Sequence, residues 1–126
     1  MSGPILALVT IGAGGAADRA SLEALGLARR LAAGTGTALE VVFVADSSAA
    51  RSGAALLTGS GATTAIVIDH PELTTDQPDG WAAAIAQVVE ARGAAAVVGA
   101  GTERGNDLLA RVAARMNLPL ASPRIR

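Results

Sequence analysis

The segment that most constrains the fold lies at residues 97–116, where a short apolar run passes through glycines into an amphipathic pattern. Leu108, Val112 and Met116 recur at helical spacing, and the arginines between them fall on another face. Strand, turn and helix in this order form half of a β-α-β unit, the unit that builds parallel sheets. The rest of the chain is therefore expected to supply further units of the same kind.

Upstream of this segment, the same alternation of apolar runs and helical patterns recurs. Strands are predicted at residues 4–10, 39–44, 64–68 and 94–98, with an edge strand at 118–120. Helices are predicted at residues 18–33 and 79–92, with a weaker one at 49–57 and a loop at 69–78. We expect Asp18 and Asp79 to cap helices, and Gly34, Gly36 and Gly93 to end them. The pattern predicts a three-layer α/β sandwich with a mostly parallel sheet.

Composition narrows the class of protein. A chain of 126 residues with 51% hydrophobic residues suits a single domain with its own core. A net charge of -1 argues against nucleic acid as a partner, and the lack of cysteine excludes disulfides and thiolate metal sites. The N-terminus has no basic region, and the apolar run at residues 5–9 is too short for a signal peptide or a membrane span. We therefore expect a cytoplasmic protein.

The first glycine cluster follows the first predicted strand. Gly12 and Gly14 fit the spacing of a dinucleotide-binding loop placed between a strand and a helix. That motif also requires an acidic residue at the end of the second strand to bind the ribose. Glu40 lies within that strand and Asp46 comes too late. A surface loop is the favoured interpretation of this cluster.

The second glycine cluster follows the fourth predicted strand. If the first and fourth strands are neighbours, both clusters lie at one crevice, where open α/β sheets bind ligands. Thr102 and the amides of Gly101 and Gly105 could then bind a nucleotide phosphate. The favoured alternative is architectural: Gly99, Gly101 and Gly105 would permit a tight turn and close packing of the helix.

The remaining polar residues do not form a recognisable catalytic set. His70 is the single histidine, and it lacks serine or cysteine partners typical of a triad. Asp69, Glu72 and Asp76 lie near it, but their spacing matches no metal-binding loop. Trp81 is expected in the core. We therefore predict no catalytic residue and no metal site.

The run at residues 102–115, Thr-Glu-Arg-Gly-Asn-Asp-Leu-Leu-Ala-Arg-Val-Ala-Ala-Arg, carries a family resemblance. It resembles the pattern Thr-x-x-Gly-Arg-Asp-Leu-x-x-Arg-Val-Ala-Ala-Arg in the N-terminal domain of electron transfer flavoprotein alpha subunits. Residues 21–23, 69–73 and 118–122 are similar to the same family, so the resemblance spans nearly the whole chain. Asn106 departs from it, because the family usually has Arg or Lys there. The implied fold is Rossmann-like, of the adenine nucleotide alpha hydrolase-like type.

The resemblance implies a scaffold domain that is not itself an enzyme. In the family, FAD is bound mainly by a C-terminal domain of the alpha subunit, which this sequence does not include, and the partner beta subunit carries AMP. The complete heterodimer passes electrons from flavin dehydrogenases to a quinone oxidoreductase. By this resemblance, residues 1–126 form a single domain fragment that binds no cofactor by itself. Apolar faces left by the missing segment would then favour self-association.

A different class of function stays open beside this one. Universal stress proteins share the expected sheet topology and include stand-alone adenine-nucleotide-binding modules. In them a Gly-x-x-Gly phosphate pattern follows the fourth strand, and the candidate residues here are Gly12 and Gly14 of the first cluster with Gly99, Gly101, Thr102 and Gly105 of the second. Their pattern, however, ends in Gly-Ser or Gly-Thr, whereas Asn106 and Asp107 follow Gly105 in this chain. A dehydrogenase that uses the first cluster is a third option, and it lacks an acid-base partner.

Overall fold

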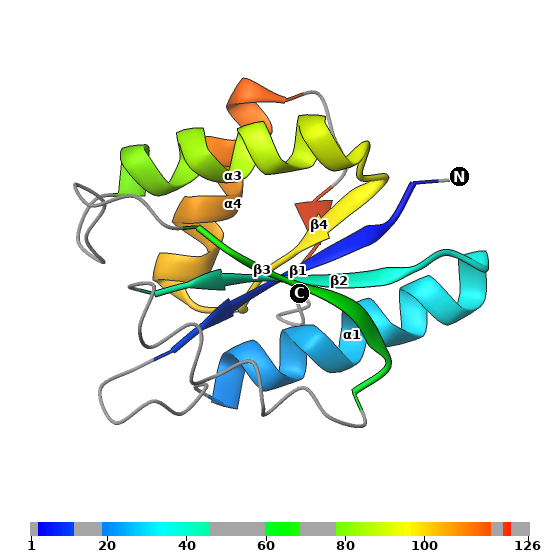
Figure 1. Ribbon diagram of the computed structural model, residues 1–126. Coiled ribbons are helices and arrows are strands. Elements are labelled where there is room, and N and C mark those ends of the chain that lie inside the picture. The colour runs from blue at the N-terminus through cyan, green and yellow to red at the C-terminus, as the bar shows by residue number, and fades with distance from the viewer. Residues whose placement is uncertain (1–2, 12–18, 46–59, 69–77, 117–119, 122–126) are drawn as a thin grey trace.

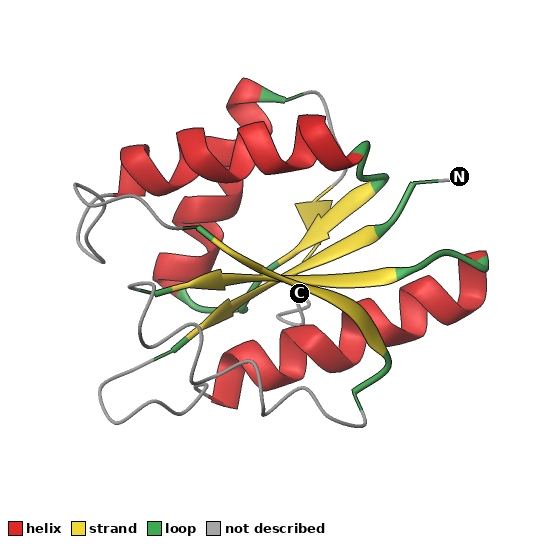
Figure 2. Ribbon diagram, viewed as in Figure 1, coloured by secondary structure: helices red, strands yellow, loops and turns green. Residues whose placement is uncertain are grey.

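The computed structural model describes residues 3–11, 19–45, 60–68, 78–116 and 120–121. Within them, strands and helices follow one another in the predicted order, with β3 as the next described element after β2 (Figures 1 and 2). The elements are β1 (Ile5–Thr10), α1 (Arg19–Thr35), β2 (Leu39–Val44), β3 (Ala62–Val67), α3 (Pro78–Arg92), β4 (Ala96–Val98), α4 (Glu103–Arg115) and β5 (Leu120–Ala121). Among these elements, no helix has the length and apolar character needed to cross a membrane.

The five strands form one parallel sheet in the order β3-β2-β1-β4-β5. Strand β1 lies at the centre, where Ile5 aligns with Leu39 of β2 on one side and with Ala96 of β4 on the other. All of β2 and the first five residues of β1 are buried. Their largely apolar sequences, interrupted in β2 by Glu40, are those of strands covered on both faces.

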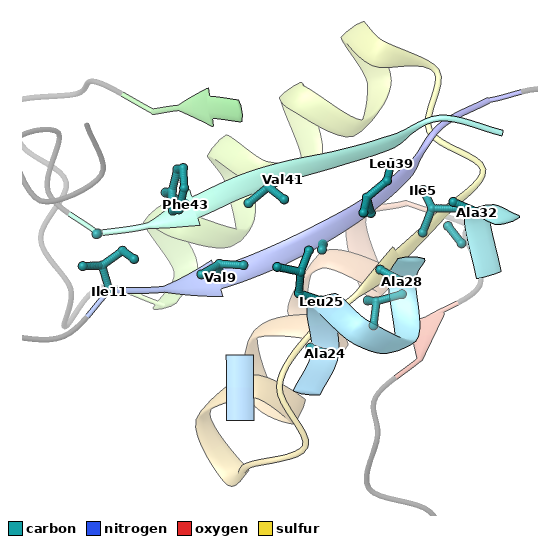
Figure 3. Packing of buried hydrophobic residues seen from close by; sticks show 14 residues of the cluster. Ile5, Val9, Ile11, Ala24, Leu25, Ala28, Ala32, Leu39, Val41 and Phe43 are labelled. Carbon is teal, nitrogen blue, oxygen red and sulfur yellow. The ribbon is translucent and has the colours of Figure 1, made fainter. Parts of the chain in front are cut away.

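Helices cover both faces of the sheet, so the three-layer sandwich is confirmed. Helix α1 lies on one face, and α3 and α4 lie on the other (Figure 1). Figure 3 shows Val9 and Val41 on the face that Leu25 and Ala28 of α1 cover. The opposite face packs the remaining buried residues of the sheet against α3 and α4, whose largest buried side chain is Trp81. Alanines at the helix contacts let α1 lie close to the sheet.

Several predicted boundaries are shifted. Strand β3 begins at Ala62, two residues before the predicted start. The strand predicted at 118–120 is described only at its end, as β5 at residues 120–121, because residues 118 and 119 lie outside the described part of the chain. Gly34 lies within α1 and does not end it, whereas Gly36 has a positive φ of 69° just after the helix. Pro78 begins α3, which places Asp79 in its first turn rather than at its cap. Asp18, the helix predicted at 49–57 and the loop up to residue 77 lie outside the described residues.

Candidate functional site

The turn between β4 and α4 is built around Thr102. This residue has an extended backbone, and its Oγ1 accepts a hydrogen bond from the Gly105 N–H at 3.0 Å. Its carbonyl oxygen accepts another from the Asn106 N–H at 2.8 Å. These are the contacts of a helix N-cap: the hydroxyl satisfies a donor that the first turn otherwise leaves without a partner, and the carbonyl accepts the first hydrogen bond of the helix itself.

Two glycines let α4 approach the end of β4 closely. A Cβ atom placed on Gly105 would lie 2.1 Å from the carbonyl oxygen of Ala100, a distance that no side chain tolerates. A Cβ on Gly99 would lie 3.0 Å from the side chain of Leu109. Gly105 therefore requires glycine, because its neighbour is backbone, whereas at Gly99 the Leu109 side chain would have to shift by a few tenths of an ångström. The close approach at Gly105 supports the architectural interpretation favoured from the sequence.

Strands β1 and β4 are neighbours, as the crevice hypothesis requires. Gly99, Gly101, Thr102 and Gly105 therefore lie at the carboxyl edge of the sheet beside the end of β1. Gly12 and Gly14 lie outside the described residues. The Gly105 N–H, one of the candidate phosphate donors, already donates to Thr102 Oγ1, whereas the Thr102 O–H is not used by this bond. The role of all six residues in nucleotide binding stays a prediction.

Ser21 holds the end of β1 against α1, a contact that sequence reasoning missed. Its side chain is fully buried, and its Oγ accepts a hydrogen bond from the Thr10 N–H at 2.9 Å. The sequence feature that could have predicted this contact is a serine on the otherwise apolar helix face defined by Ala24, Leu25 and Ala28. A buried hydroxyl needs such a partner, because burial without hydrogen bonds is costly.

Glu40 and Arg92 form a bidentate ion pair between β2 and the end of α3. Arg92 Nε donates to Glu40 Oε1 at 2.9 Å, and Arg92 Nη2 donates to Oε2 at 2.6 Å. Hydrogen bonding to Glu40, followed by the charge of that carboxylate, raises the pKa of Arg92 above its usual value. Glu40 is near the amino end of β2, at the edge of the sheet opposite the glycine turn. Its place and partner identify it as a structural acid rather than a ribose ligand.

Arg111 links the two helices on one face of the sheet. It donates from Nε to Asp107 Oδ2 at 3.0 Å within α4 and from Nη1 to Asp79 Oδ1 of α3. Hydrogen bonds to Asp107 and then Asp79 raise the pKa of Arg111 above its usual value. All three side chains are partly or largely exposed, so solvent screens the pairs.

The remaining candidate residues from the sequence do not form a catalytic or metal site within the described part of the chain. Trp81 is 2% exposed and belongs to the core, as expected. His70, Asp69, Glu72 and Asp76 lie outside the described residues. Within the described ranges, no group of three or more acidic or histidine side chains is placed to hold a metal ion.

Solved structures with the same arrangement include two universal stress proteins. A universal stress protein family member from Burkholderia pseudomallei has a TM-score of 0.64 and 17% identity, covering 97% of this chain and 96% of its own. The protein from Archaeoglobus fulgidus has a TM-score of 0.57 and 14% identity, covering 96% and 97%. A glycosyltransferase from Rickettsia africae has a TM-score of 0.56 and 13% identity over 94% of this chain, which spans 28% of that protein. At these identities the likeness shows the fold alone.

Family membership comes from the sequence. Comparison with curated proteins gives no match. The family model described as the electron transfer flavoprotein domain matches residues 5–123, from the first residue of β1 to beyond β5. The match includes the capped turn, its close-packed glycines and the ion-paired helix α4. The chain therefore belongs to the electron transfer flavoprotein domain family.

Proposed function

We propose that this chain is the N-terminal domain of an electron transfer flavoprotein alpha subunit and acts as a scaffold in that assembly. The observation that carries the proposal is the family match over residues 5–123, which includes every described strand and helix. The pattern at residues 102–115 favours the alpha subunit within this family. In this role the domain supports electron transfer from flavin dehydrogenases to a quinone oxidoreductase.

The contacts of the motif residues support a structural role. Thr102 caps α4, Gly105 packs against Ala100, and Arg111 joins α4 to Asp79 of α3. Each contact is made inside the domain: the first forms the start of α4, the second sets α4 against the end of β4, and the third joins α4 to α3. Three residues of the motif by which the chain resembles the family therefore contribute to folding, which supports a structural role.

The proposal assigns the cofactors to other parts of the assembly. FAD would be held by the C-terminal domain of the alpha subunit, and AMP by the beta subunit. This chain would contact both polypeptides and help to orient them. One observation supports this division: the Gly105 N–H, a candidate phosphate donor, already donates to Thr102 Oγ1.

Reconstitution from separate polypeptides tests the proposal. The purified chain, the FAD-binding domain and the beta subunit are mixed and analysed by size-exclusion chromatography, with flavin fluorescence recorded in parallel. We expect one heteromeric complex that contains all three polypeptides and FAD, while the chain alone leaves flavin fluorescence unquenched. A mixture without the chain is the control. Stoichiometric FAD binding by the chain alone, or complete assembly without it, would refute the scaffold role.

The adenine-nucleotide-binding alternative is supported by one observation, the adjacency of β1 and β4 at the glycine turn. Thermal denaturation with added AMP or ATP separates the two functions, because a ligand that binds the native state raises the midpoint. The scaffold proposal expects no shift. A rise of several degrees with either nucleotide would favour the alternative and contradict the proposal that this chain binds no nucleotide.

A further inference from the structure

Strand β3 forms one edge of the sheet and is the most exposed of its longer strands. Within the described ranges it pairs with β2 alone. Thr63 and Ala65 are exposed and the other residues of β3 are partly buried, whereas all of β2 is buried. An edge strand presents a row of backbone N–H and C=O groups that water or another strand must satisfy. The chemistry that matches this edge is therefore a second β-strand.

The sequence of β3 lacks the charges and prolines that usually protect an edge strand. Residues 63–68 read Thr-Thr-Ala-Ile-Val-Ile, with β-branched side chains at every position except Ala65. Neutral six-residue segments of high β-propensity are those that pair with copies of themselves. One protective irregularity is present: the register skips Thr63, whose Oγ1 donates to the Leu39 carbonyl oxygen. From Thr64 onward the pairing with β2 is regular.

We propose that residues 64–68 at the β3 edge form a self-association surface whose occupant is β3 of a second copy of this chain. A two-fold axis perpendicular to the sheet sets the two strands antiparallel and joins two five-stranded sheets. This rotation keeps each face of the sheet on its own side. Ala65 aligns with Val41 on the α1 face, so it meets residues of the α1 face of the other copy.

Charge and exposure favour a second copy over other occupants. Because residues 61–68 carry no charge, two copies meet without like-charge repulsion, and the edge has no charge with which to select an acidic or basic segment. The described surface exposes a single large hydrophobic side chain, Leu22, which is 50% exposed on α1. Among the described residues, the β3 edge is therefore a better route to self-association than an apolar patch.

The size of this contact predicts a weak dimer. One pair of short strands buries less area than the roughly 1,200 Å² at the lower end of stable specific interfaces. We therefore expect dimers to form at high protein concentration and to dissociate on dilution. This inference concerns the chain alone and does not depend on a beta subunit, so reconstitution of the flavoprotein can fail while dimerisation succeeds, or the reverse.

A charge-pairing experiment tests the edge. In a dimer of either variant, Ala65→Lys or Ala65→Glu, both copies carry the same charge at residue 65. The two charged side chains are then directly or diagonally opposite each other across the paired strands, close enough to repel. Sedimentation equilibrium over a concentration series should show a dissociation constant raised about tenfold or more in each variant. An equimolar mixture of the two should recover association, because Lys and Glu then face each other. Ala91→Lys and Ala91→Glu, at an exposed alanine of α3, are the matched controls and should leave association unchanged.

Other outcomes would overturn the proposal. A wild-type chain that stays monomeric at all concentrations excludes it, as does association that both Ala65 variants leave intact. Loss of association in Leu22→Ser with no effect of Ala65→Lys would place the contact on α1 instead. If the charged variants fail to fold, hydrogen exchange of the wild type still decides: protection of the residue 64–68 amides must rise with protein concentration, while that of the α3 amides does not.

Discussion

Single glycines in this domain differ in what they do, although the sequence contains fifteen of them. Gly105 has no room for a methyl group, because its neighbour is the backbone carbonyl of Ala100. Gly34 lies in α1 with nothing within 4 Å of an added Cβ. The same substitution should therefore have opposite effects at these two positions.

We expect Gly105→Ala to lower the free energy of unfolding by about 1–3 kcal/mol, since α4 must shift away from the sheet. Gly34→Ala, the matched control, should raise it by about 0.5–1 kcal/mol, because alanine is the better helix former at an open site. Urea denaturation measures both. A neutral Gly105→Ala would show that the turn does not need the close contact.

The ion pair of Glu40 and Arg92 also affects the stability of the domain through individual residues. Arg92→Met should destabilise the domain more than the double variant Glu40→Met/Arg92→Met, because the single variant leaves a buried carboxylate without its partner. The raised pKa of Arg92 means that its contribution is complete below the pKa of the unfolded chain and is lost only as the pH rises through the folded value. Urea denaturation measures the free energy of unfolding of both variants. A lower value for the double variant than for Arg92→Met would contradict this account.

At the scale of elements, the sequence predicted the order and type of every described strand and helix. The near-continuous apolar run at residues 4–10 and the β-branched residues of 39–44 were sufficient to predict β1 and β2, because both strands are almost entirely buried. The face of α4 was predicted less well: Leu109 is 1% exposed, while Leu108 and Met116 are only partly buried. That face depends on how Gly99 and Gly105 set the helix on the sheet, which periodicity does not encode. Ser21 and the partner of Glu40 were missed because both depend on contacts between distant segments.

The start of α4 depends on its cap. Thr102→Ala should destabilise the domain by about 1 kcal/mol, because the Gly105 N–H loses its acceptor. Thr102→Ser keeps a hydroxyl at the same position and should retain most of the stability. Thermal denaturation compares the two variants. Equal losses in both would indicate that the threonine methyl group, rather than the hydrogen bond, matters.

At the scale of the whole molecule, the sheet separates two apolar clusters that share its strands. Ile5, Ala7 and Val9 face the α1 side, and Leu6 and Leu8 face the α3 and α4 side. Loss of either helical layer therefore exposes residues of the same central strand. The two layers are expected to unfold together.

Trp81, the single tryptophan, reports on one of these layers. Its emission should move to longer wavelength on unfolding, because the indole is buried in the native domain. We expect this transition to coincide with the loss of far-ultraviolet circular dichroism, as a single cooperative unit requires. A separate fluorescence transition would show that the α3 and α4 layer unfolds independently of the α1 layer.

The central place of β1 also shapes how the chain can reach its native state. Strand β1 comes first in the sequence, but one of its two neighbours, β4, is made only after residue 95. A nascent chain can pair β1 with β2 early. The other side of β1 stays unpaired until β4 has been synthesised. Pairing between distant segments raises the contact order and slows folding relative to helical bundles of similar size. During that interval the central strand of the finished domain is itself an open edge.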